Sequence, residues 1–80
     1  MPLYEFLDGI KINVYMNDHV PPHIHAGIGE YESLIDIKKV SVMVGNLPKT
    51  HLRKALKYVR DNQEELLTEF YSLNPTIKVL

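Results

Sequence analysis

The stretch HIHAGIGEYESLIDI, residues 23–37, predicts the hairpin around which the rest of the chain can be arranged. It contains two extended runs with β-branched and aromatic side chains, separated by Gly29 and Glu30, and such runs are typical of strands. Glycine in the first position of a two-residue loop favours a type II′ turn, whose twist matches that of the flanking strands. The turn predicts these cross-strand pairs: Ile28 with Tyr31, Gly27 with Glu32, Ala26 with Ser33, His25 with Leu34, Ile24 with Ile35, and His23 with Asp36.

This register sorts the side chains of the hairpin onto two faces, because successive side chains of a strand point in opposite directions. One face is mostly apolar and is expected to pack against helices: Ile24, Ala26, Ile28, Tyr31, Ser33 and Ile35. The other face holds His23, His25, Glu32 and Asp36. Directly opposed Cβ atoms lie about 4.5–5.5 Å apart, so we expect Asp36 to reach His23. Glu32 is diagonal to His25 and can reach that ring by bending.

Three further segments outside this hairpin have strand character. Residues 10–16, IKINVYM, alternate apolar and polar side chains, which is the period of a half-buried strand. Residues 3–7 are a candidate preceding strand, joined to it by Asp8-Gly9, a favoured two-residue hairpin turn. Residues 40–44, VSVMV, are a fifth candidate and end at Gly45-Asn46.

The rest of the chain has helical periodicity that begins near Pro48, a residue tolerated in the first turn of a helix. Apolar residues recur at i, i+3, i+4 and i+7 from Leu52 onward. Basic side chains precede acidic ones, and a break at residues 60–62 places both groups at the favourable ends of the helix dipoles. Asp61 followed by Glu64 resembles a capping box. Asn74-Pro75 ends the helical region, and residues 76–80, TIKVL, are a candidate edge strand.

These elements predict an α+β fold in one domain covering residues 1–80. A small, mostly antiparallel sheet of about four to five strands comes from the N-terminal half. It is packed by two C-terminal helices or by one kinked helix. The tyrosines and phenylalanines are interpreted mostly as core or core-edge residues, and His51 as a surface residue.

Composition limits the setting and the chemistry. Cysteine is absent, which excludes disulfides and thiolate zinc sites and fits a reducing compartment. The first residues lack the basic and apolar regions of a secretory signal, and no apolar run approaches the ~20 residues that span a bilayer. We therefore expect a cytoplasmic protein without a membrane partner. The formal net charge of −1 does not suggest a general nucleic-acid binder.

The histidine cluster supports a metal hypothesis and a proton-transfer hypothesis. In the first, His19, His23 and His25 bind a divalent transition metal such as zinc, and a carboxylate completes the site. In the second, which needs no cofactor, His23 and His25 act as general base and general acid, as in a metal-independent ribonuclease. Asp36 orients one imidazole, and Lys11, Lys49 or Arg53 supplies a cation for the phosphate.

A third interpretation is that the histidines are ordinary solvated side chains on a polar sheet face. Two prolines, Pro21 and Pro22, hold the loop before His23 extended, which favours a defined role for the cluster without saying which one. The first helix also carries a basic stripe, which can contact phosphates or an acidic partner or simply face solvent. Its members are Lys49, Arg53, Lys57 and Arg60.

Four segments resemble a bacterial domain-of-unknown-function family, numbered 4160. They are DHVPPHIHA at residues 18–26, GEYE at residues 29–32, Asp36-Ile37, and GNLP at residues 45–48, which opens an amphipathic helix. The resemblance covers nearly the whole chain. It implies a small bacterial α+β protein that is often encoded beside a partner of another uncharacterised family. His19, His23 and His25 match the family pattern, which assigns them no established chemistry.

Pairs of this kind are commonly proposed to be type II toxin–antitoxin modules, with this family as the toxin. The resemblance therefore implies a protein partner encoded by a neighbouring gene, with RNA as a candidate substrate. Oligomerisation remains open. We expect a toxin-like protein that acts on RNA through His23 and His25, with His19, Glu32, Lys49 and Arg53 as binding residues. The alternatives are a metal-binding module without catalysis, or an interaction protein that docks its partner through an open sheet edge or the basic helix.

Overall fold

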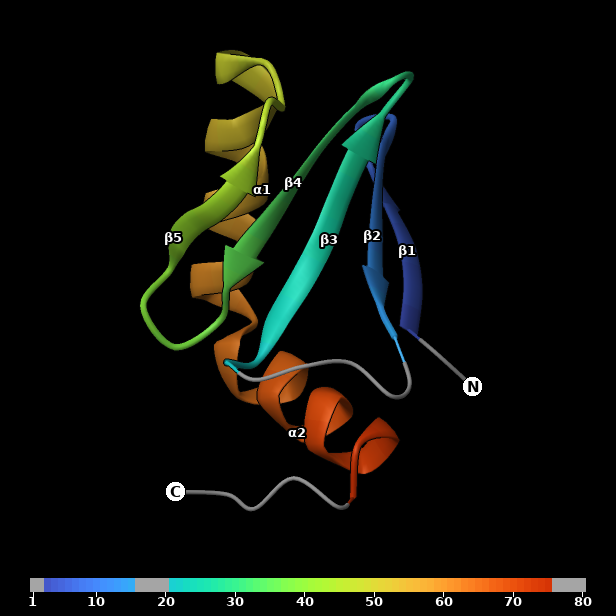
Figure 1. The fold of residues 1–80 in the computed structure, drawn as a ribbon, viewed down its shortest axis with the longest axis vertical. Helices are drawn as coiled ribbons and strands as arrows, with labels where there is room; N and C mark the ends of the chain where they lie inside the picture. The colour runs from blue at the N-terminus through green and yellow to red at the C-terminus, as the bar shows by residue number, and fades with distance from the viewer. Residues whose placement is uncertain (1–2, 16–20, 76–80) are drawn as a thin grey trace.

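The fold of this protein is seen in a computed structural model, which describes residues 3–15 and 21–75. Within these residues, five strands are followed by two helices. Figure 1 shows how these elements are arranged. The strands are β1 (Leu3–Leu7), β2 (Ile10–Val14), β3 (His23–Ile28), β4 (Tyr31–Asp36) and β5 (Ser41–Gly45). They form one antiparallel sheet in the order β1-β2-β3-β4-β5, and the predicted α+β class is confirmed. The helices are α1 (Lys49–Asp61) and α2 (Gln63–Leu73).

The central hairpin of β3 and β4 has the predicted register. Every predicted pair is present, from Ile28 opposite Tyr31 to His23 opposite Asp36. Gly29 has a φ of 58°, which is the conformation that the first central position of a type II′ turn requires. A one-residue slip would move every apolar side chain to the opposite face. The turn and the apolar pattern therefore specify the same pairing.

The other strand connections also depend on backbone conformations with positive φ. Asp8 and Gly9, between β1 and β2, have φ values of 48° and 83°, as expected for the predicted hairpin turn. Gly45 has a φ of 125°, and a Cβ atom there would lie 2.2 Å from the carbonyl oxygen of Glu32. Only glycine fits at this point, where the chain leaves β5 and turns toward α1.

The helical region breaks into two helices at Asn62, within the predicted interval. The backbone N–H of Asn62 donates to the carbonyl oxygens of Tyr58 and Val59, and its side-chain amide donates to Tyr58 O at 2.9 Å. The predicted capping box is wrong. Asp61 instead accepts a hydrogen bond from Lys57 Nζ at 2.9 Å, and this bond lowers the pKa of Asp61. Asn62 caps α2 without a side-chain hydrogen bond.

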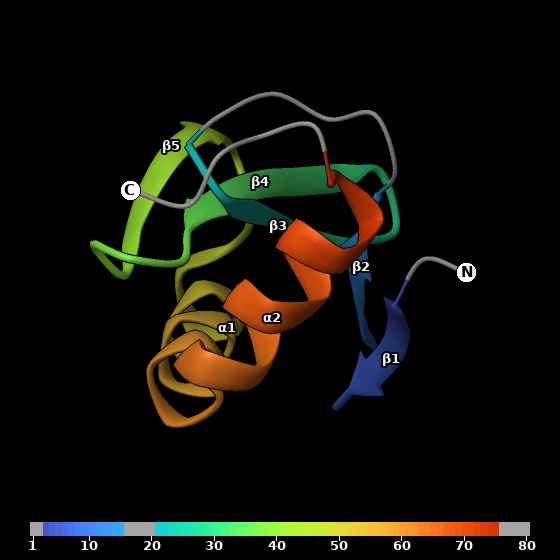
Figure 2. The ribbon, with the colours of Figure 1, turned by 90° about the horizontal axis from the view of Figure 1, so that it is seen from below.

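Both helices lie on the same side of the sheet, and Figure 2 shows the sheet curving around them. Apolar side chains of β2, β3 and β4 meet those of the helices in a single core. Its buried members are Ile10, Ile12, Val14, Ile24, Ala26, Ile35, Ile37, Leu47, Ala55, Val59, Leu66 and Phe70. The predicted core face of the hairpin is thus confirmed at Ile24, Ala26, Ser33 and Ile35. Tyr31 is an exception, since it is 42% exposed.

The end of α2 is tied to the sheet by Asn74, as the predicted stop at Asn74-Pro75 requires. This buried side chain donates to Tyr15 O at 3.1 Å and to Phe70 O at 2.9 Å. The predicted edge strand at residues 76–80 lies outside the described residues. Within the described part of the chain, neither helix has the length and apolarity needed to cross a membrane.

Candidate functional site

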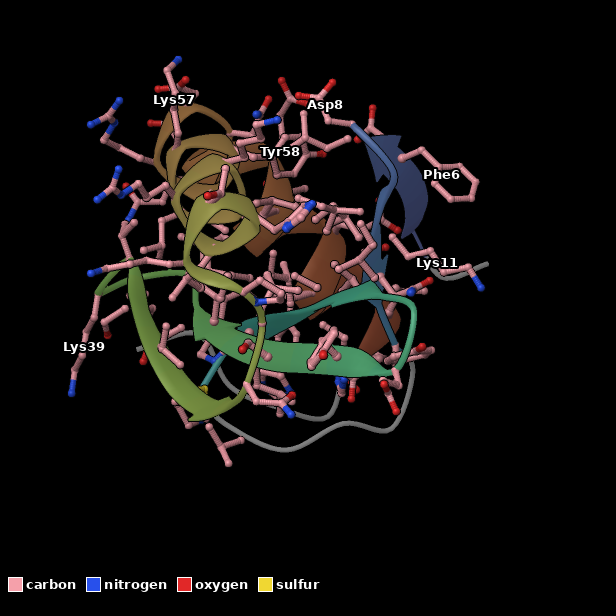
Figure 3. All side chains as sticks on the ribbon, turned by 90° about the horizontal axis from the view of Figure 1, so that it is seen from above. Phe6, Asp8, Lys11, Lys39, Lys57 and Tyr58 are labelled. Carbon is pink, nitrogen blue, oxygen red and sulfur yellow. The ribbon has the colours of Figure 1, made fainter. Side chains whose placement is uncertain are left out.

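The candidate site lies on the open face, which we define as the face of the sheet opposite the helices. Phe6 of β1 pairs with Lys11 of β2, and both side chains project away from the helices in Figure 3. The pairing continues to β3, where Lys11 is opposite Gly27 and Asn13 is opposite His25. Residues paired across neighbouring strands share a face. Three strands therefore present aromatic, basic, amide and imidazole groups together.

His25 occupies the position predicted for it, on the open face and beside a carboxylate. Its side chain is 17% exposed, and its Nδ1 atom lies 3.8 Å from Glu32 Oε2. The ring of Tyr15 meets it edge-on, with 4.6 Å between the ring centroids. The Tyr15 and Glu32 contacts hold the imidazole from two sides while part of it stays in contact with solvent. His25 is therefore held in place and also accessible.

His23 lies two residues away in a different environment. It is only 3% exposed, with its ring centroid 5.1 Å from that of His25 and 5.9 Å from that of Phe70 in α2. Its Nδ1 atom is 2.8 Å from the carbonyl oxygen of Pro21. A carbonyl only accepts, so Nδ1 carries the hydrogen, and Pro21 fixes the ring tautomer. His23 is therefore a buried neighbour of His25 and does not face solvent.

Asp36 is opposite His23, as predicted, but its described hydrogen bond serves the chain turn after β4. The carboxylate is 4% exposed, and its Oδ1 atom accepts a hydrogen bond from the backbone N–H of Lys39 at 2.9 Å. The carbonyl oxygen of Asp36 accepts from Val40 N at 2.9 Å. Both bonds close the connection between β4 and β5, in which Val40 has a φ of 51°. Asp36 therefore stabilises this turn through its side chain and its backbone carbonyl.

The remaining predicted site residues are not brought to the histidines. Lys49 and Arg53 are exposed on α1, in the helical layer that covers the opposite face of the sheet. Lys11 is the predicted cation that lies on the open face. His19 lies outside the described residues, so the proposed histidine ligand set stays a prediction. Within residues 3–15 and 21–75, no three His, Asp or Glu side chains are grouped so as to hold a metal ion.

The sequence interpretation missed three exposed aromatic side chains. Phe6, Tyr15 and Tyr31 were expected in the core or at its edge, but they are 61%, 40% and 42% exposed. All three are among the residues that line a cavity of about 510 Å³. Phe6 and Tyr15 belong to the open face, whereas the register places Tyr31 with Ile28 on the other face. The other lining residues are Gly9, Lys11, Asn13, Gly27, Ile28, Gly29, Glu30 and Glu32. The alternation of β2 contains a signal for Tyr15, because it follows Lys11 and Asn13 at a spacing of two.

The geometry defines an antiparallel sheet with one face closed by helices and one face carrying a histidine and exposed aromatic residues. A family model described as "Domain of unknown function (DUF4160)" matches residues 9–70. The chain belongs to this family. The matched region includes four of the strands, α1 and most of α2, and therefore the histidines of β3. Neither the curated proteins nor the solved structures yielded a match.

Proposed function

We propose that this protein is the toxin component of a bacterial, cytoplasmic type II toxin–antitoxin module and that it cleaves RNA with His25. One observation carries the chemical part of the proposal: the partly exposed imidazole of His25 lies 3.8 Å from Glu32, and Glu32 lines a cavity together with Lys11. An imidazole can move protons near neutral pH, and a lysine can balance phosphate charge. The toxin role rests on the family resemblance given by the histidine motif.

In the proposed reaction His25 carries one proton from the attacking hydroxyl to the leaving oxygen. Neutral His25 accepts the proton of a ribose 2′-hydroxyl, and the 2′-oxygen attacks the neighbouring phosphorus. The bond from phosphorus to the 5′-oxygen breaks, and the imidazolium returns its proton to that oxygen. The products are a 2′,3′-cyclic phosphate and a 5′-hydroxyl. Glu32 stabilises the charged ring during this transfer, because its carboxylate lies at ion-pair distance.

His23 and Asp36 act as positioning residues in this proposal. His23 packs against His25 and holds a fixed tautomer through Pro21. Asp36 shapes the turn next to the start of β3, opposite His23. Loss of either side chain is expected to lower the rate through misplacement of His25. Neither substitution is expected to change the pH dependence of the cleavage rate, whereas replacement of His25 is expected to change it.

Induced expression in a bacterial host tests the proposal. Expression of the unsubstituted protein is expected to arrest growth and to generate RNA fragments with 2′,3′-cyclic phosphate ends. His25→Ala is expected to abolish both effects. His51→Ala is the matched control, since His51 lies in the first turn of α1, away from the open face. Circular dichroism checks that both variants are folded. Arrest that persists in the His25→Ala protein would refute the histidine mechanism.

The proposed protein partner has a candidate docking strand in β5. All five residues of this edge strand are exposed, and none is charged. Val42, Met43 and Val44 are 40%, 41% and 59% exposed. An apolar, uncharged edge strand can extend its sheet with a strand from another chain. We propose that the product of the neighbouring gene pairs with β5. We expect the two proteins to co-purify and this co-purification to be lost in a Val44→Lys variant. It should be retained in Thr68→Lys, since Thr68 is exposed on α2, away from β5.

A further inference from the structure

The cavity on the open face has a floor without a side chain. Gly27 lies opposite Lys11 on one side and opposite Glu32 on the other. A Cβ atom at Gly27 would find its nearest neighbour, Tyr31 O, at 3.4 Å, so the backbone does not require glycine there. The absence of a side chain leaves a hollow between the flanking residues. Phe6 and Tyr15 also line the cavity, and both have exposed side chains.

The charges around the hollow are not those of a groove that follows a phosphate backbone. Lys11 is the basic residue in the cavity lining, while Glu30 and Glu32 are acidic. A surface that binds many phosphates is expected to be basic along its length. This cavity instead offers aromatic rings with one cation and two carboxylates. The combination suits flat, uncharged groups that carry amino hydrogens and are attached to a single phosphate.

We propose that the open face binds an unpaired segment of RNA, whose bases stack on Phe6 and Tyr15 and one of whose phosphates contacts Lys11. Stacking on aromatic side chains is how sheet surfaces take up single strands, and it works because every base has a π-face. The carboxylates of Glu30 and Glu32 accept hydrogen bonds from exocyclic amino groups of the bases, as glutamate does for cytosine N4. This inference rests on the proposed action on RNA and names the substrate as single-stranded.

Binding and cleavage can be measured separately. The probe is a fluorescently labelled 2′-O-methyl RNA strand of mixed sequence, about eight nucleotides long, a typical length for such sites. It lacks the 2′-hydroxyl and is not cleaved, so fluorescence anisotropy reports binding alone. The same strand annealed to its complement is the comparison. We expect the single strand to bind and the duplex to bind at least tenfold more weakly, because its bases are already stacked and paired.

Aromatic substitutions test the stacking surface directly. Phe6→Ala and Tyr15→Ala are each expected to weaken binding about tenfold, within the range measured for loss of one base–aromatic stack. Phe6→Tyr and Tyr15→Phe keep a ring and are expected to bind within about twofold of the original protein. Because both side chains are largely exposed, the alanine variants are expected to stay folded, which thermal unfolding verifies.

Salt dependence tests the single phosphate contact. With one phosphate neutralised, the logarithm of the association constant is expected to fall with the logarithm of salt concentration at a slope near −0.7. Lys11→Gln brings the slope toward zero. Lys39→Gln, an exposed residue between β4 and β5 on the opposite side of the molecule from Lys11 in Figure 3, leaves it unchanged. Equal binding of duplex and single strand, or alanine variants that bind normally, would overturn the inference. No binding of the single strand by the isolated protein would also refute it. Single-strand binding without growth arrest would leave this site intact and remove the toxin proposal.

Discussion

Two neighbouring positions on one face of β3 have different environments. His23 and His25 are on the same face and two residues apart, but His23 is 3% exposed while His25 keeps contact with solvent. The difference comes from what lies next to each ring. Phe70 of α2 reaches His23, with 5.9 Å between the ring centroids, whereas His25 is flanked by Tyr15 and Glu32. Strand pairing thus sets neighbours along the sheet, and helix placement decides which of them meet water.

The largest expected effect comes from removing the ring that covers His23. Phe70 is fully buried, and truncation of a buried phenylalanine costs about 3–5 kcal/mol of the free energy of unfolding. Phe70→Ala is expected to destabilise the protein by this amount and to open the buried end of the face. Chemical denaturation measures the loss. Phe70→Leu, which retains more apolar volume, is the control and should lose less. Similar stabilities for the two variants would contradict the assigned packing.

The second prediction concerns the connection beside Glu32, at the accessible end of the site. Gly45→Ala would place a Cβ atom 2.2 Å from Glu32 O at a φ of 125°. Non-glycine strain of this kind costs about 1–3 kcal/mol, and the backbone clash adds to it. We expect a loss of roughly 3 kcal/mol, measured by urea denaturation. Gly29→Ala, with a φ of 58° and nothing within 4 Å of its Cβ, should lose only about 1–2 kcal/mol.

The third prediction tests the helix-covered side through its pH dependence. The Tyr58 hydroxyl donates to Glu5 Oε2 and joins α1 to β1. Burial and then the Glu5 hydrogen bond raise the pKa of Tyr58 above its usual value of 10.0. Because the folded pKa is raised, this contribution to stability is complete below pH 10 and is lost as the pH rises above it. Tyr58→Phe should flatten the fall in stability between about pH 10 and 11, monitored by fluorescence-detected unfolding. An unchanged pH slope would exclude this linkage.

The smallest expected change in stability is at the floor of the cavity. Gly27→Ala places a Cβ atom at ordinary contact distance, so the free energy of unfolding should change by less than about 1 kcal/mol. The added methyl group occupies part of the hollow between Lys11 and Glu32. Binding of the single-stranded probe should weaken while stability stays nearly constant. If binding and stability fall together, Gly27 has a structural role instead.

The predictable part of the fold is local. Gly29-Glu30 and Asp8-Gly9 specify turns from their own backbone preferences, and the alternation around them sets the register. The helix break near Asp61 follows from the order of charges along the chain. The capping residue could not be chosen in this way, because Asp61 is engaged by Lys57 and Asn62 closes α1. The register of the β3–β4 hairpin also predicted that Glu32 lies close to His25.

The sequence by itself determined which side chains are neighbours in the sheet, because turns of two residues leave a single register that keeps the apolar face together. Only the tertiary structure decided what those side chains face. The burial of His23 depends on Phe70, a residue of the last helix. The exposure of Phe6 and Tyr15 depends on both helices packing against the opposite face. Local backbone preferences do not determine where distant helices pack. The solvent exposure of these side chains therefore depends on the tertiary structure.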